Sequence, residues 1–146
     1  MSVSFFSKIR GLTAADWLTL VEIPFLWLSA VIAVRFFPLK KLQLLFEKSP
    51  SVQSSLDSAA LTDRLQRLSI AFFRRLPFEA GCLEKSLAFL ILLKQHGLPA
   101  DLKIGLKKEH ETLKAHAWIE QDGKILFDDP SFCREYAAAS LPSFLK

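Results

Sequence analysis

The pattern of apolar residues changes character once along the chain, at residues 97–99. Before this break, apolar residues recur at the three- and four-residue spacing that is typical of helices. After it, residues 100–108 alternate apolar and polar side chains, as expected for a half-buried strand. Two further strand-like runs, 113–120 and 124–129, follow. Helices followed by a three-stranded antiparallel meander predict an α+β fold.

The first helix is expected to begin at Thr13, which forms a capping pair with Asp16. Residues 16–37 would then form a helix with apolar side chains on nearly every face. The length of this segment is close to the ~20 residues that a membrane span needs. However, Asp16, Glu22 and Pro24 interrupt the first half of this segment. We therefore expect a helix that is buried or covered by a partner protein, with peripheral or spanning membrane contact as the alternative.

A chain of 146 residues suits one domain, or one domain with an appendage. We predict an N-terminal helical region for partner docking (1–48), a serine-rich linker (49–60) and a catalytic core (61–146). The core should contain two helices, at 61–76 and 81–97. After the strands, the tail should form a short helix and an irregular end.

Composition narrows the possible functions. The formal net charge is +4, but the basic residues are interspersed with acidic ones, so nucleic-acid binding is not indicated. The two cysteines are too few for a disulfide scaffold and lack metal-binding spacing, so we expect no metal or other cofactor. No signal-peptide pattern begins the chain. These features favour a protein of the reducing cytoplasm, either free or associated with a membrane surface.

Cys82 is expected at the start of the 81–97 helix, directly after Gly81. The positive end of a helix dipole, and an imidazolium nearby, favour the thiolate form of a cysteine. Gly81 would leave room for a substrate carbonyl, and the Cys82 N–H could donate to an oxyanion. The alternative is that Cys82 is only a small apolar residue in a packed helix. The same packing role is expected for Cys133, because its helix-like segment lacks a neighbouring base.

His116 could act as the base for this thiol if a carboxylate orients it. A two-residue turn before the last strand would place His116 opposite Asp129, whereas a three-residue loop, 121–123, would place it opposite Asp128. We favour the longer loop, because it pairs Glu120 with Lys124 and puts Gly123 in a left-handed conformation. Asp128 would then orient the imidazole, although two aspartates before a proline are also common in a simple turn.

Several motifs in the C-terminal half resemble the transglutaminase-like cysteine peptidases of lasso-peptide maturation. In that family a Cys-Leu pair opens a helix, an Ala-His-Ala-Trp strand follows, and an aspartate comes after an Asp-Gly turn. The matching residues are Cys82-Leu83, Ser86-Leu87-Ala88, Gly97-Leu98-Pro99-Ala100, Ile104-Gly105-Leu106-Lys107, residues 115–120, Asp122-Gly123 and Asp128. The helical N-terminal half is similar in character but carries no sharp motif.

The resemblance implies a transglutaminase-like, distantly papain-like fold and a triad of Cys82, His116 and Asp128. It implies hydrolysis of one peptide bond, which removes the leader from a ribosomally made precursor peptide. The chain looks like the stand-alone peptidase of a split system, whose partners would be a leader-binding protein and a lasso cyclase. Two alternatives stay open: another acyl transferase on the same triad, or a non-catalytic membrane or assembly adaptor.

Overall fold

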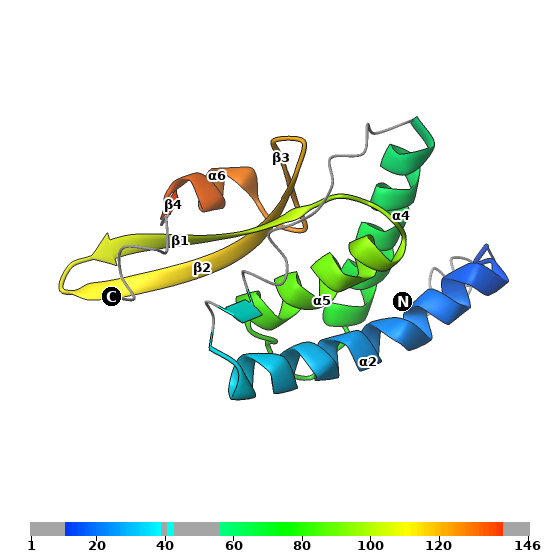
Figure 1. Cartoon of the computed structure of the whole chain (residues 1–146), viewed down its shortest axis with the longest axis horizontal. Coiled ribbons are helices and arrows are strands. Elements are labelled where there is room, and N and C mark those ends of the chain that lie inside the picture. Colours follow the sequence, from blue (N-terminus) through cyan, green and yellow to red (C-terminus); the bar gives the residue numbers. More distant parts are fainter. Residues whose placement is uncertain (1–10, 39–40, 43–55, 139–146) are drawn as a thin grey trace, which may run out of the picture.

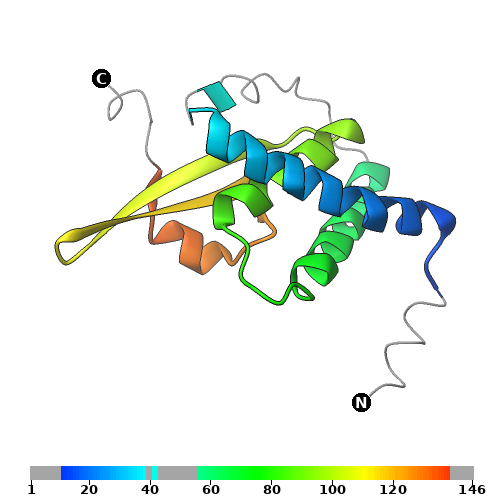
Figure 2. The same cartoon turned by 90° about the horizontal axis from the view of Figure 1, so that it is seen from below.

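The structure is a computed structural model that describes residues 11–38, 41–42 and 56–138. Its elements are α2 (Ala14–Phe36), α4 (Leu56–Phe73), α5 (Cys82–Gln95), β1 (Asp101–Glu109), β2 (Thr112–Gln121), β3 (Lys124–Leu126), α6 (Pro130–Arg134) and β4 (Ala137–Ala138). Helices α2 and α5 lie on one side of the long β1–β2 hairpin, and α6 lies on the other (Figures 1 and 2). The predicted α+β class is confirmed.

The sheet is antiparallel, with strand order β3-β2-β1-β4. The first three strands form the predicted meander. The two-residue strand β4 adds to the outer edge of β1 through the pair Gly105↔Ala138, in a segment that was expected to be irregular. An ion pair between Lys107 of β1 and Glu135 also joins α6 to the sheet. These long-range contacts hold the C-terminal segment against the sheet, and local periodicity does not encode them.

One apolar core connects all the large elements. It contains Ile23 of α2, Leu65 of α4, Phe89 of α5 and Ile119 of β2, each at most 2% exposed. Burial of a side chain of this size stabilises a fold by roughly 1.5–3 kcal/mol. Helix α2 therefore shares its core with the helix and strand that carry the candidate catalytic residues.

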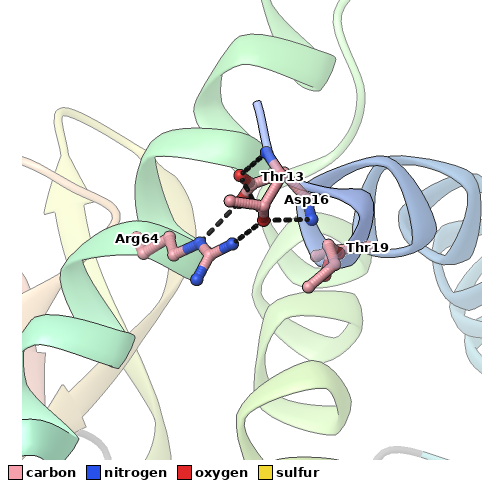
Figure 3. Close-up of polar contacts among 5 residues, drawn as sticks. Thr13, Asp16, Thr19 and Arg64 are labelled. Atoms are coloured by element: carbon pink, nitrogen blue, oxygen red, sulfur yellow. Dashed lines mark hydrogen bonds and ion pairs between the residues drawn. The ribbon is translucent and has the colours of Figure 1, made fainter. Parts of the chain in front are cut away.

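The start of α2 is held to α4 by a buried carboxylate (Figure 3). Thr13 and Asp16 form the predicted capping box, with Asp16 Oδ2 accepting from Thr13 N at 2.7 Å. Asp16 Oδ1 also accepts from Arg64 Nε at 2.5 Å. The Arg64 hydrogen bond is the main reason why the pKa of Asp16 falls to about 2, against the opposing effect of desolvation. The cap that begins α2 thus also serves as a tertiary contact.

Only one face of α2 is buried. Large apolar side chains cover its outer face, and Leu18, Phe25 and Phe36 are each more than two-thirds exposed. The others on this helix are Trp17, Val21, Leu28 and Ile32. Among the described residues, α2 is the one helix long and apolar enough to cross a membrane, a test that core helices and signal sequences also pass. We call these seven side chains the α2 apolar face.

Helix α4 begins earlier and ends earlier than predicted. It starts at Leu56, inside the stretch expected to be a linker, and ends at Phe73. Asp57 lies in its first turn, where the helix dipole favours a negative charge, and two alanines follow. Pro77 disfavours a helical conformation for the residue before it, which limits any extension. Residues 49–55 of the predicted linker lie outside the described residues.

Candidate active site

The hairpin between β2 and β3 has a two-residue turn, so the predicted three-residue loop is wrong. Asp122 and Gly123 both have positive φ, 50° and 76°, as a type I′ turn requires. The resulting pairs are Ile119↔Leu126, Glu120↔Ile125 and Gln121↔Lys124. A tertiary contact also keeps Gln121 in the strand, because its Nε2 donates to Pro99 O at 2.8 Å.

This register alone would carry His116 opposite Asp129, yet His116 contacts Asp128. The distance from His116 Nε2 to Asp128 Oδ2 is 2.5 Å. The ladder stops at Leu126, and Phe127 turns the chain with a φ of 68°. This left-handed conformation is costly for an aromatic residue, by roughly 1–3 kcal/mol. The predicted His-Asp contact therefore exists, but for a different reason from the one expected.

Packing holds Phe127 in this conformation. Its ring stacks on Phe89 of α5, with centroids 5.0 Å apart, and meets the edge of Phe73 at 5.6 Å. Both partners belong to helices that precede the sheet in the sequence. The turn that aims Asp128 at His116 thus depends on contacts between residues far apart in the chain.

Asp129 has a separate, structural role. It is the N-cap of α6, and its Oδ1 accepts from Ser131 N at 2.8 Å. The hydrogen bonds from Ser131 lower the pKa of Asp129 below its ordinary value. The two neighbouring aspartates are therefore divided between one that contacts the histidine and one that starts a helix.

Aromatic rings enclose His116. Trp118 lies nearly parallel to the imidazole at a centroid distance of 6.1 Å. Phe132 meets it edge-on at 5.0 Å, and Tyr136 lies 5.3 Å away. The His116 side chain is consequently only 13% exposed, whereas that of Asp128 is 29% exposed. The local sequence gives no sign of the roles of Phe132 and Tyr136, because only the folding of α6 onto the sheet brings them to the histidine.

Gly105 of β1 is the cross-strand partner of His116. A Cβ at this position would lie 2.6 Å from Tyr136 Cβ and 2.8 Å from the Trp118 ring. Such distances are far below van der Waals contact. Gly105 therefore provides the space in which two of the rings around His116 pack.

Cys133 also lies beside this pair, contrary to the expectation that it has no neighbouring base. Its Sγ, a His116 ring nitrogen and an Asp128 carboxylate oxygen all lie within 4.8 Å of one another. The Cys133 side chain is buried, and desolvation, with Asp128 contributing, raises the pKa of its thiol to about 11. Cys133 is thus protonated at neutral pH and is a poor nucleophile.

Cys82 is the first residue of α5, with Gly81 as its N-cap, and it is half-buried. One turn later, Ser86 Oγ donates to Ala117 O at 3.0 Å, which joins α5 to the residue after His116. Residues four apart lie on the same face of a helix, so Cys82 shares the face that Ser86 turns toward β2. Side chains alternate along a strand, however, so Ile119 packs against α5 whereas the His116 ring faces Phe132 of α6, on the other side of the sheet (Figure 1). The space beside Gly81 that was expected to be open is instead occupied by the Glu84 carboxylate.

The structure joins two of the three predicted catalytic residues directly. His116 and Asp128 are in contact, whereas among the described residues Cys82 makes no hydrogen bond with His116. Because Nε2 faces Asp128, the other ring nitrogen, Nδ1, is the one left for a thiol. The imidazole faces α6, on the side of the sheet opposite α5, so His116 or Cys82 would have to move for the thiol to reach Nδ1 (Figure 1). The assignment of all three residues to one triad stays a prediction.

A cleft of about 460 Å³ lies next to the start of α5. Its lining comes from the end of α4, the connection that leads to Cys82 and the first turns of α5, and includes Phe73, Arg74, Phe78, Glu79, Ala80 and Lys85. The cleft thus combines aromatic walls with charges of both signs. Its volume lies within the ordinary range of ligand-binding pockets.

Comparison with known families identifies the class of protein that this fold defines. Residues 19–140 match the transglutaminase-like superfamily, and the chain belongs to it. The match includes α2 from Thr19 onward as well as Cys82, His116 and Asp128. Members of this superfamily are typically cysteine peptidases or acyltransferases. The comparisons with curated proteins and with solved structures found no match.

Proposed function

We propose that this protein is a cysteine peptidase that removes the leader peptide from a lasso-peptide precursor, with Cys82 as nucleophile. The single observation that carries the proposal is the 2.5 Å contact between His116 Nε2 and Asp128 Oδ2, which leaves Nδ1 of a shielded imidazole for a thiol. The motifs that resemble those of lasso-peptide leader peptidases support the choice of this substrate. Membership of the transglutaminase-like superfamily supports the reaction class.

In the proposed reaction, His116 Nδ1 takes the proton of the Cys82 thiol while Asp128 stabilises the imidazolium. The thiolate attacks the carbonyl carbon of the last leader residue. The Cys82 N–H belongs to the first turn of α5, where N–H groups lack helical acceptors, so it is available to the oxyanion. His116 then gives its proton to the leaving core amine. A water molecule, deprotonated by His116, cleaves the thioester and releases the leader carboxylate.

The cleft beside the start of α5 is the candidate site for the peptide around the scissile bond. It reaches Ala80, two residues before Cys82, and Lys85, one turn after it. Phe73 and Phe78 provide apolar walls for substrate side chains, and Arg74 and Lys85 can hydrogen-bond to backbone carbonyls. Cys82 itself does not line the cleft, so a peptide bound there would extend along the start of α5 to reach the thiol.

The proposed partners are a separate leader-binding protein and a lasso cyclase. The α2 apolar face is our candidate docking surface for them, because contiguous exposed apolar side chains commonly mark interaction sites. Contact with a membrane surface is the competing role for the same face. A cytoplasmic location, free or at the membrane surface, would place the peptidase beside its ribosomally made substrate.

The test is cleavage of a lasso precursor peptide in the presence of its leader-binding protein. Wild type should make one specific cut, Cys82→Ala should abolish it, and the matched control Cys133→Ala should retain it. Asp128→Asn should lower kcat by roughly 10²–10⁴-fold, because the imidazole loses its orienting carboxylate. Equal cleavage by wild type and Cys82→Ala would assign the activity to another nucleophile or to a contaminant.

Superfamily membership also keeps a second enzymatic function in view, transfer of the acyl group to an amine. Both reactions share the thioester on Cys82 and differ only in whether water or an amine accepts the acyl group. Adding a primary amine to the cleavage assay distinguishes them. A stoichiometric amide adduct of the leader would indicate acyl transfer, and the free leader acid would indicate hydrolysis.

A further inference from the structure

The neighbourhood of His116 contains three kinds of metal ligand from three parts of the chain. The imidazole of His116 comes from β2, the carboxylate of Asp128 follows β3, and the thiol of Cys133 comes from α6. One ligand atom from each lies within 4.8 Å of the other two. Among the residues that the structure describes, this is the one such group of His, Cys, Asp or Glu side chains.

We propose that His116, Asp128 and Cys133 bind a zinc ion, and that zinc bound there inhibits the enzyme. Zinc takes cysteine sulfur at about 2.3 Å, histidine nitrogen at about 2.0–2.1 Å and carboxylate oxygen at about 2.0–2.2 Å. In a tetrahedron with such bonds, neighbouring ligand atoms lie roughly 3.3–3.7 Å apart. A water molecule completes the four ligands.

The observed geometry is close to this requirement. The His116–Asp128 pair must open from 2.5 Å by about 1 Å, and no pair in the group has to close by more than about 1.5 Å. Rotation of the Asp128 side chain, which is 29% exposed, provides the opening and a path from solvent. The buried Cys133 gives up its thiol proton to water as the Zn–S bond forms, as happens when a thiol coordinates zinc.

Inhibition follows from which ring nitrogen the metal takes. Nε2 faces Asp128 and would be the nitrogen bound to zinc. A neutral imidazole bound through Nε2 keeps its one proton on Nδ1, so it cannot accept the proton of Cys82. Zinc would also remove Asp128 from its orienting role. This regulatory half of the inference rests on the proposed peptidase function, whereas the binding half does not.

Metal binding can be measured without any substrate. We would titrate the full-length protein with Cd²⁺ and follow the ultraviolet charge-transfer band of a cadmium–thiolate bond, then displace Cd²⁺ with Zn²⁺. In wild type and in Cys82→Ala, the band should saturate at one Cd²⁺ ion per protein chain. In Cys133→Ser the band should be absent. A band that persists in Cys133→Ser and disappears in Cys82→Ala would place the metal on the other cysteine and overturn the proposal.

A second variant covers the case in which Cys133→Ser does not fold. Asp128→Asn changes a partly exposed ligand and should weaken Cd²⁺ binding by at least tenfold, since a carboxylate oxygen is lost. Unchanged Cd²⁺ affinity in Asp128→Asn would overturn the three-ligand site. Near-ultraviolet circular dichroism verifies that each variant retains its tertiary structure.

The inhibitory half is tested by zinc titration of precursor cleavage. Wild type should lose activity with zinc and regain it with a chelator, and Cys133→Ser should need at least tenfold more zinc for the same inhibition. Equal sensitivity in both proteins would refute inhibition through this site. Wild type that shows the cadmium band but never cleaves precursor would instead refute the proposed function and leave the metal site standing.

Discussion

The carboxylate of Asp16 should contribute a measurable, pH-dependent part of the stability of the fold. It is buried, it accepts from Thr13 N at 2.7 Å, and it pairs with Arg64 of α4 at 2.5 Å. Its pKa falls from 3.8 to about 2, which corresponds to roughly 2.4 kcal/mol at about 1.4 kcal/mol per pKa unit. Because the Arg64 side chain is 39% exposed, solvent screening reduces this figure, and we expect about 1–2 kcal/mol.

The perturbation is Asp16→Asn, which preserves shape and removes the charge. The unfolded chain binds a proton near the ordinary pKa and the folded chain only near pH 2, so the contribution of Asp16 is complete above about pH 5. It is lost as the pH falls from about 4 to about 2. Urea unfolding of wild type and variant at pH 7, 5 and 3 should therefore show a stability difference that is constant at first and then shrinks.

The control is Asp63→Asn, which makes the same charge change next to Arg64 on the exposed face of α4. It should alter the free energy of unfolding by less than about 0.5 kcal/mol. If Asp16→Asn lowers the free energy of unfolding at pH 7 by no more than this control does, the carboxylate does not stabilise the contact between α2 and α4. A difference that stays the same from pH 7 to pH 3 would show that the charge of Asp16 is not its source.

Three further changes test other parts of the structure. Gly105→Ala should lower kcat and should lower the free energy of unfolding by about 1–3 kcal/mol, because the new methyl group displaces two rings around His116. Peptide cleavage measures the first effect and thermal unfolding measures the second. Ser86→Ala should cost about 1–3 kcal/mol in urea unfolding, because it leaves the Ala117 carbonyl without its side-chain donor. Phe25→Ser should weaken pull-down by the leader-binding protein, or by lipid vesicles, with little loss of stability, because this side chain is 68% exposed.

Each of these changes has a matched control and a contrary outcome. Gly11→Ala meets nothing within 4 Å, and equal effects at Gly11 and Gly105 would discount crowding at the site. Ser29→Ala removes an exposed hydroxyl group that is hydrogen-bonded within its own helix. If Ser29→Ala and Ser86→Ala lower the free energy of unfolding equally, Ser86 does not stabilise the contact between α5 and β2. If Phe25→Ser binds both partner and vesicles as wild type does, the α2 apolar face is not the docking surface.

Local patterns in the sequence predicted the type of most helices and strands and one cap, but not the ends of α4 or the length of the β2–β3 turn. The Thr13–Asp16 box, the helix that starts at Cys82 and the turn after β1 all depend on residues within a few positions of one another. Hydrogen bonding and side-chain spacing over that range follow the helix and strand periods. Strand β4 could not be predicted from local patterns, because it exists only by pairing with β1.

The sequence by itself determined which chemical groups are available: a thiol at a helix start, a histidine in a strand and two aspartates after a hairpin. Only the tertiary structure decided which aspartate meets the histidine, because the stacking of Phe127 on Phe89 holds the left-handed turn that aims Asp128. The packing of α6 against the sheet placed Cys133 beside His116 and Asp128. Contacts between distant segments outweigh local preferences here, since the buried rings stabilise a backbone conformation that the local sequence disfavours.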